Sequence, residues 1–284
     1  MPEPYRAVLT PAGVKHPRVR EFLAVKRRPA TSGPAGTMAL EGTWMIGQAL
    51  AAGLRLQAVF VCPALLHRAE GRAVARSAVR AAAEGYEVSE RVLARLADRD
   101  HPDGIAALGE VRARTLDDVA VGPRTRVVVA DGWDLPGNLG TLIRCADAAG
   151  AAGVVVVEPG FGLGHPLVVR ASMGAALTVP VVAAGRAAAR QWLGDQGFRI
   201  VAADPAGSRS YRDIDYRGPL AIIVGSERRG LAPEWLAAAD STAAIPMLGS
   251  CDSLNAAIAA ALLLYEVLAQ DELVRRLRAD PGQR

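Results

Sequence analysis

Two polar side chains stand at the start of a long apolar helix near the end of the chain. Ser253 and Asn255 begin the predicted helix over 253–269, and an Ile245-Pro246-Met247 turn and a bend of small residues lead into it. Capping of the helix start would account for one of the two side chains. The other side chain and the bent loop predict that a small ligand binds at this entrance.

A second segment, residues 131–150, combines glycines with an asparagine and an arginine after a predicted strand. Asn138 and Arg144 are six residues apart, which is about 240° around a helix, so they cannot share a helical face. We therefore expect Asn138 to cap a helix and Arg144 to lie on its second turn. Because apolar residues flank Arg144, its charge needs an anionic partner if it is buried. That partner is either an internal acid, Asp131 or Asp147, or a bound phosphate.

A third polar group follows a predicted strand over 220–225. The strand runs into Gly225-Ser226-Glu227-Arg228-Arg229-Gly230, which places the Glu227 carboxylate at the end of the strand. Open parallel α/β sheets bind ligands at the carboxyl ends of their strands. Taken alone, Glu227 is better explained by an ion pair with Arg228 or Arg229.

Nucleotide-binding loops of the common kinds are missing from the sequence. The glycine-rich segment 159–166 has the spacing G-x-G-x-G, which is not the dinucleotide fingerprint G-x-G-x-x-G. No G-x-x-x-x-G-K-[ST] motif occurs anywhere. The sequence therefore argues against a nucleotide-dependent kinase and against an ordinary Rossmann oxidoreductase.

The elements that must position these groups alternate between helices and strands. In the N-terminal part we predict helices over 16–26, 40–52, 64–84 and 89–97, and strands over 56–62, 86–88 and 104–111. After a polar segment the predicted strands are 125–131, 153–157, 179–183, 198–203, 220–225 and 242–246, and the predicted helices are 139–149, 165–176, 186–196, one from Pro233, and 253–269. Apolar, β-branched strands between helices favour a parallel sheet with helices on both faces. We predict one domain over 1–111, a linker over 112–123 and a second domain over 124–284.

The positive charge of the chain is concentrated in its N-terminal part. The net charge is +4, and residues 15–28 carry six basic groups against one acid, Glu21. Such a cluster is either a solvated helix face or a contact surface for a phosphate backbone. The predicted RNA-binding residues are Lys15, Arg18, Arg20, Lys26, Arg27, Arg28 and, from the second segment, Arg144.

The composition favours a cytoplasmic protein without a metal. Half of the residues are apolar, yet no uncharged apolar run reaches the length of about 20 residues that a membrane span requires. The N-terminus lacks the pattern of a signal peptide. The three cysteines, Cys62, Cys145 and Cys251, and the four histidines are scattered, which suits a reducing compartment and predicts no metal site.

The three segments together resemble the motifs of the SpoU family of the SPOUT superfamily, which are RNA ribose 2′-O-methyltransferases. The first motif, N-x-G-x-x-x-R, matches 138–144, the second, G-x-E-x-x-G, matches 225–230, and the third, I-P-M followed by S-L-N, matches 245–247 and 253–255. Residues 170–175 resemble an R-A-S-x-G-A element of the family. The N-terminal region is similar to the family's substrate-binding domain, which has a ribosomal-protein-like α/β fold, through Leu40-Glu41-Gly42 and the segment 101–106.

The resemblance implies an α/β SPOUT domain with a deep trefoil knot, which holds S-adenosylmethionine in a bent form. It implies that the cofactor is bound by Ala203, Gly225, Ser226, Glu227, Gly230, Ile245, Met247, Ser253 and Leu254. The chain departs from the family at Asp204, where relatives often carry threonine beside the methionine part of the cofactor. Homodimers are also implied, with the apolar face Leu254, Ile258, Leu262 and Tyr265 in the interface, although packing in the core would give the same pattern.

The resemblance further implies transfer of a methyl group to a ribose 2′-hydroxyl. Arg144 would contact the phosphate of the target and assist deprotonation, while Asn138, Glu227, Ser253 and Asn255 would position the reacting groups. The N-terminal domain indicates a structured target, for which we expect large-subunit ribosomal RNA. The chain is similar to antibiotic-resistance methyltransferases of the avilamycin and thiostrepton types, the former in particular. The alternatives are a housekeeping enzyme for ribosomal or transfer RNA and a non-catalytic RNA-binding relative.

Overall fold

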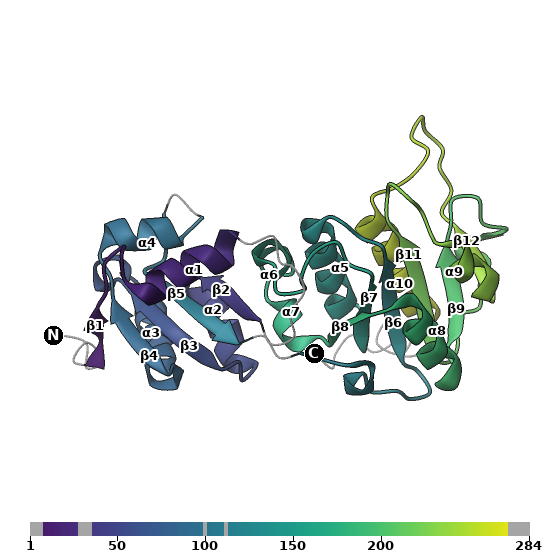
Figure 1. Ribbon diagram of the computed structural model, residues 1–284. Helices are drawn as coiled ribbons and strands as arrows, with labels where there is room; N and C mark the ends of the chain where they lie inside the picture. Colours follow the sequence, from purple (N-terminus) through teal and green to yellow (C-terminus); the bar gives the residue numbers. More distant parts are fainter. Residues whose placement is uncertain (1–7, 28–35, 99–100, 111–112, 272–284) are drawn as a thin grey trace, which may run out of the picture. The chain divides into compact units, whose positions relative to one another are not determined.

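The chain folds into two compact units, each built around its own sheet (Figure 1). The computed structural model describes residues 8–27, 36–98, 101–110 and 113–271. The first unit comprises Met1–Ala113 with Gly162–Val169, and the second comprises Arg114–Phe161 with Arg170–Arg284. The division after Ala113 falls within the segment that the sequence predicts as a linker.

The first unit contains a mixed five-stranded sheet. Its strands, in spatial order, are β1 (Thr10–Pro11), β4 (Glu84–Glu87), β3 (Leu56–Val61), β5 (Ile105–Glu110) and β2 (Thr37–Glu41). Strands β1, β4 and β3 are parallel, whereas β5 runs antiparallel to both of its neighbours. The helices are α1 (Pro17–Arg27), α2 (Thr43–Ala51), α3 (Ala69–Ala81) and α4 (Glu90–Leu96).

Alternating side chains of the central strand β3 divide these helices between the two faces of the sheet. Phe60 lies in one buried cluster with Phe22 of α1 and Leu93 of α4. Val59 points the other way, where a Cβ built on Gly85 would lie 3.8 Å from Val79 of α3 and 3.9 Å from Val59. Helix α2 packs against α3. Helices α1 and α4 therefore cover one face, and α2 and α3 cover the other.

Two predicted helices of this unit were wrong at their N-terminal ends. The prediction of a helix over 40–52 included Leu40 and Glu41, which belong to β2 and pair with β5. The helix begins only at Thr43, because Gly42 adopts a φ of 87° and interrupts the chain direction. The helix predicted over 64–84 is a single turn of 3₁₀-helix at Pro63–Leu65 followed by α3 from Ala69.

The second unit confirms the predicted parallel sheet with helices on both faces. Its seven strands are all parallel. They are, in spatial order, β10 (Arg209–Ser210), β12 (Ser241–Ala244), β9 (Arg199–Ala203), β11 (Leu220–Gly225), β6 (Arg126–Asp131), β7 (Gly153–Val157) and β8 (Val181–Ala184). Helices α8 (Arg186–Asp195) and α9 (Pro233–Ala238) bury Ala189, Leu193 and Trp235 against one face. Helices α5 (Pro136–Ala148) and α10 (Ala256–Gln270) pack on each other and on the sheet. The trefoil knot stays a prediction.

The helix predicted over 165–176 is broken into α6 (Pro166–Ala171) and α7 (Ala175–Thr178). Met173 and Gly174 have positive φ angles of 51° and 83°, which a right-handed helix does not allow. Within the part of the chain that the structure describes, no helix is both long and apolar enough to cross a bilayer.

Candidate functional site

The Glu227 carboxylate joins the three segments that the sequence singled out. Its Oε1 accepts hydrogen bonds from Asn138 Nδ2 at 2.5 Å, from Asn255 Nδ2 at 3.0 Å and from the backbone N–H of Ala256 at 3.3 Å. These donors lie 89, 28 and 29 residues away from Glu227 in the sequence. One oxygen atom therefore fixes the start of α5 and the start of α10 to the loop after β11.

The loop after β11 holds its shape through a close contact between backbone segments. Ser226 pairs with Gly230 in an isolated bridge, and the Gly230 N–H donates to the Ser226 carbonyl at 2.8 Å. A Cβ at Gly225 would lie 2.2 Å from the carbonyl carbon and oxygen of Gly230 and 2.5 Å from the Leu231 nitrogen. Position 225 therefore requires glycine, because the atoms in the way are backbone atoms.

The expectation that Asn138 caps a helix was wrong. Helix α5 begins two residues earlier, at Pro136, whose fixed φ suits the first helical position. Leu135 is the N-cap residue and makes no side-chain capping bond. Asn138 lies inside the first turn, so its side chain reaches Glu227 instead of the helix's own backbone.

Asn255 does cap its helix. Its Oδ1 accepts hydrogen bonds from the N–H groups of Ala257 and Ile258 at 3.1 and 3.3 Å, while its Nδ2 donates to Glu227. The helix predicted from 253 accordingly begins at Ala256. Ser253 is exposed, and its hydroxyl donates to Asp252 at 3.1 Å.

Arg144 is exposed on α5 and has no partner among the residues that the structure describes. The alternative of an internal ion pair with Asp131 or Asp147 is therefore wrong. Asp131 is only 3% exposed and accepts from Arg186 Nε at 3.2 Å, and its other oxygen accepts from the Ala232 N–H at 3.2 Å. Because solvent rather than apolar side chains surrounds Arg144, its charge carries no burial cost and can meet an external anion.

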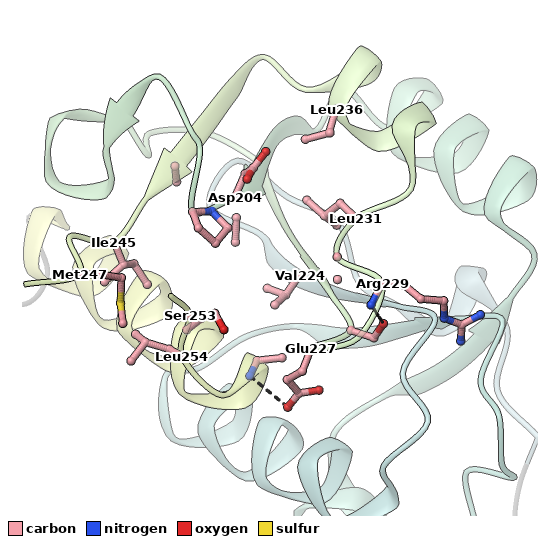
Figure 2. A pocket seen from close by; sticks show the side chains of 18 residues that line it. Asp204, Val224, Glu227, Arg229, Leu231, Leu236, Ile245, Met247, Ser253 and Leu254 are labelled. Atoms are coloured by element: carbon pink, nitrogen blue, oxygen red, sulfur yellow. Dashed lines mark hydrogen bonds between the residues drawn. The ribbon is translucent and has the colours of Figure 1, made fainter. Parts of the chain in front are cut away.

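A cavity of about 340 Å³ opens beside Glu227, between the ends of β9, β11 and β12 and the start of α10 (Figure 2). Its lining includes all nine residues expected to bind a cofactor: Ala203, Gly225, Ser226, Glu227, Gly230, Ile245, Met247, Ser253 and Leu254. In Figure 2, Ile245, Met247 and Leu254 form one apolar wall, and Leu231 and Leu236 lie across the cavity from it. Asp204, the departure from the family pattern, also lines the cavity, and its Oδ1 accepts from the Ala206 N–H at 2.9 Å.

Sequence reasoning missed two residues, Arg186 and Trp133, that link the carboxyl ends of neighbouring strands of this sheet. Arg186 bridges Asp131 and Glu158, with its Nη2 3.1 and 3.0 Å from their oxygens. The buried Trp133 donates from Nε1 to the carbonyl of Val224 at 3.0 Å. Each is an isolated residue in the sequence, and its partners lie 28 or more positions away. The one available signal was the position of Asp131 at the end of a predicted strand.

Two residues of the predicted RNA-binding cluster are instead engaged in structural ion pairs. Arg18 donates from Nε to Glu84 at 3.0 Å and from Nη1 to Glu21 at 2.9 Å. Lys26 lies 2.6 Å from Asp98 and donates to the Leu96 carbonyl at 2.7 Å. These contacts fix α1 within the first unit. The alternative of a solvated helix face is therefore wrong for Arg18 and Lys26.

The other basic residues of this cluster differ in their surroundings. Lys15, Arg20 and Arg27 are exposed, with no ion pair to any residue in the described ranges. Arg28 lies outside the described residues. Binding of RNA by the three exposed residues stays a prediction.

The Arg18–Glu84 pair predicts how the stability of the protein depends on pH. Hydrogen bonds from Arg18 and Tyr86 lower the pKa of Glu84 to about 2, from an ordinary value of 4.5. The stabilisation is therefore complete above about pH 4.5 and is lost as the pH falls through about 2. We expect Glu84→Gln to lower the midpoint of thermal unfolding at pH 7. The difference in midpoint between the variant and the wild type should become smaller as the pH is lowered toward 2. An equal effect at both pH values would contradict this assignment.

Among the residues that the structure describes, no three or more His, Cys, Asp or Glu side chains are grouped closely enough to hold a metal ion. The site is therefore built from a carboxylate, amides, apolar side chains and backbone groups. Such a set can hold a small organic molecule with a flat apolar part and polar ends.

Comparison with known proteins agrees with this geometry. Residues 125–265 match the model of the SpoU rRNA methylase family, and residues 17–107 match the MRM3-like substrate binding domain. An uncharacterized tRNA/rRNA methyltransferase of Mycobacterium ulcerans is 31% identical over 269 residues, covering 90% of this chain and 84% of the relative. The chain belongs to the SpoU rRNA methylase family.

Two further relatives have names that specify ribosomal RNA. A 23S rRNA (uridine(2479)-2′-O)-methyltransferase of Streptomyces viridochromogenes is 35% identical over 176 residues, which is 60% of this chain and 61% of the relative. The match thus spans less than two thirds of that enzyme. The crystal structure of an AdoMet-bound rRNA methyltransferase from Sinorhizobium meliloti has a TM-score of 0.80 and 30% identity, and the match covers 91% of this chain and 96% of that one.

Proposed function

We propose that this protein is an S-adenosylmethionine-dependent RNA 2′-O-ribose methyltransferase that acts on large-subunit ribosomal RNA. The observation that carries the proposal is the position of Glu227. This carboxylate lies on the rim of a cavity and holds together residues from all three family motifs. A related protein without catalytic activity would have no need to keep this arrangement.

The cavity suits the proposed cofactor. Its volume of about 340 Å³ lies in the range of small-molecule sites. The apolar side chains of Ile245, Met247 and Leu254 offer a surface for a flat base, and the backbone of the 225–230 loop offers hydrogen-bonding groups. The carboxylates of Asp204 and Glu227 suit the positive charges of the sulfonium and the ammonium group. The AdoMet-bound relative of the same fold supports this assignment.

The residues of this chain would orient the target and its proton. When bound, S-adenosylmethionine supplies an electrophilic methyl group. The ribose 2′-hydroxyl would give up its proton to solvent as its oxygen took that methyl group. Arg144 holds the adjoining phosphate and favours loss of the proton by its positive charge, while Asn138 and Asn255, fixed by Glu227, position the reacting groups.

Large-subunit ribosomal RNA is the target that the relatives favour. The Streptomyces viridochromogenes relative is named for a uridine of 23S rRNA. We further propose a role in resistance to a ribosome-targeting antibiotic of the avilamycin type. The alternative is a housekeeping methyltransferase of ribosomal or transfer RNA, which relatives named tRNA/rRNA methyltransferases support.

The apolar face of α10 supports a homodimer. Ile258, Leu262 and Tyr265 are 47%, 38% and 53% exposed, so the core of this chain does not account for them. Side chains of this kind at helical spacing form a surface suited to a second copy. Sedimentation equilibrium of the whole protein tests this, and a monomer at micromolar concentration would refute it.

A methyl-transfer assay tests the proposed function. The protein is incubated with tritiated S-adenosylmethionine and separately with 23S rRNA, 16S rRNA and total tRNA. We expect incorporation into 23S rRNA, with the label at one ribose located by primer extension at low nucleotide concentration. Label in tRNA alone would support the housekeeping alternative. Cofactor binding by calorimetry without transfer to any RNA would favour the non-catalytic one.

A further inference from the structure

Four arginines follow one another at helical spacing along one side of α3 and its first flanking residue. They are Arg68, Arg72, Arg76 and Arg80. Residues that are four apart in an α-helix are separated by about 6 Å along its axis and by about 40° around it. The buried residues Gly71, Ala75 and Ala78 occupy the adjoining side of the helix. We call this row the α3 arginine row.

Two arginines of this row have no counter-charge among the residues that the structure describes. Glu70 is the only acid in α3. Arg68 and Arg80 are exposed and make no ion pair or hydrogen bond with any residue in the described part of the chain. Like charges at this spacing destabilise a helix by about 0.2–0.5 kcal/mol per pair. The charges of Arg68 and Arg80 are therefore available to an external anion.

An exposed tryptophan lies on α2, the helix that packs against α3. Trp44, in the first turn of α2, is 45% exposed. A Cβ built on Gly71, at the start of α3, would lie 3.1 Å from Thr43, so the first turns of the two helices are in contact. Trp44 therefore lies on a helix whose first turn contacts the start of α3, and its exposed ring is free to stack on a base.

Two neighbouring loops complete this edge of the first unit. Arg72 Nη1 donates to the carbonyls of Leu66 and His67 at 3.0 and 2.8 Å, which ties the loop before α3 to the row. Asp103 accepts from the N–H of Thr43 at 3.3 Å, which ties the loop before β5 to α2. The exposed imidazoles of His67 and His101 lie on these loops. The edge thus combines basic, aromatic and hydrogen-bonding groups on a fixed frame.

We propose that this edge, formed by the α3 arginine row and Trp44, is the surface of the first unit that binds RNA. The arginines would contact successive phosphates of one strand, and Trp44 would stack on an unpaired base. This inference rests on the proposed function, because it names where the RNA substrate is held. It differs from the prediction from the sequence, which placed the contact on α1, on the opposite face of the sheet.

The chain provides a matched control for this proposal. Arg20 and Arg27 of α1 are exposed, like Arg68 and Arg80, and lack ion pairs to described residues. The double variants Arg68→Ala/Arg80→Ala and Arg20→Ala/Arg27→Ala therefore remove the same charge from opposite faces of one sheet. Arg72 and Arg76 are left unchanged, because Arg72 also supports the loop before α3.

The experiment measures binding of the whole protein to a fluorescein-labelled RNA hairpin with an unpaired loop, over a series of salt concentrations. We expect the α3 double variant to bind about tenfold more weakly and to lower the slope of log K against log salt by about 1 to 2. The α1 double variant should bind nearly as the wild type does. Trp44→Leu should weaken binding about tenfold, and Trp44→Phe should restore most of it, because the phenyl ring still stacks.

Three results would overturn the proposal: equal weakening by the two double variants, weakening by the α1 variant alone, or no weakening by either. Thermal unfolding confirms that the variants are folded, and an Arg68→Lys/Arg80→Lys variant that binds well shows that charge is responsible. The methyl-transfer assay of the wild type separates this inference from the proposed function. If the wild type transfers no methyl group but its binding to the hairpin depends on the α3 arginines, the proposed function is wrong and the RNA-binding surface on α3 is supported.

Discussion

Arg144→Ala is expected to reduce methyl transfer to 23S rRNA by about 10² to 10⁴-fold, the range of a lost acid–base or charge contribution. Arg144 is exposed, has no partner among the described residues and does not line the cavity. Its removal should therefore leave the fold and the affinity for S-adenosylmethionine unchanged. The measurements are initial rates with tritiated cofactor, a calorimetric Kd and a thermal melt.

A conservative variant sharpens this test. Arg144→Lys keeps the charge but loses the planar fork that binds a phosphate through two hydrogen bonds, so we expect only partial recovery of the rate. Arg228→Ala is the control, because Arg228 is also an exposed arginine and neither lines the cavity nor has a partner among the described residues. Full activity of Arg144→Ala would remove this residue from the chemistry.

Gly225→Ala is expected to abolish cofactor binding, with an increase in Kd of at least about a hundredfold. The added methyl group would meet backbone atoms of Gly230 and Leu231 at 2.2–2.5 Å, so the Ser226–Gly230 bridge would have to open. That bridge shapes one wall of the cavity and places Glu227 on its rim. Overpacking against backbone, which cannot move aside as a flexible side chain does, also predicts a lower unfolding temperature.

Gly194→Ala gives the matched control for that variant. Gly194 lies within α8, where an added Cβ has nothing within 4 Å. We expect this variant to bind the cofactor normally and to be more stable by up to about 1 kcal/mol, because alanine favours the helix. Normal cofactor binding by Gly225→Ala would show that the loop after β11 does not shape the site.

The regular elements were largely predictable because each rests on a local pattern. The buried strands β6, β7, β9 and β11 were recognised from runs of apolar, β-branched residues. Errors occurred where a single backbone conformation overrides the pattern. The sequence predicts a helix from residue 40, but the strand β2 continues to Glu41 and the positive φ of Gly42 delays the start of α2. The positive φ angles of Met173 and Gly174 divide the helix predicted over 165–176.

The candidate site was predictable in composition but only partly in geometry. All nine expected cofactor residues line one cavity, because the carboxyl ends of neighbouring parallel strands meet at one edge of the sheet. The role of Asn138 was misjudged, because Pro136 extends the helix backward by a turn. Arg186 and Trp133 were not foreseen at all, since no spacing rule connects them to the motifs.

By itself, the sequence determined the types of chemical group in the site, their order along the chain and the kinds of element that carry them. Those properties depend on neighbours within a few residues. The tertiary structure decided which groups meet. Glu227 accepts hydrogen bonds from Asn138 and Asn255, and Arg144 pairs with no acid among the described residues. Arg18 and Lys26 form ion pairs within the first unit. It also packed α2, which carries Trp44, against α3. Such pairings depend on contacts between residues far apart in the chain, which only the packing of helices and strands can select.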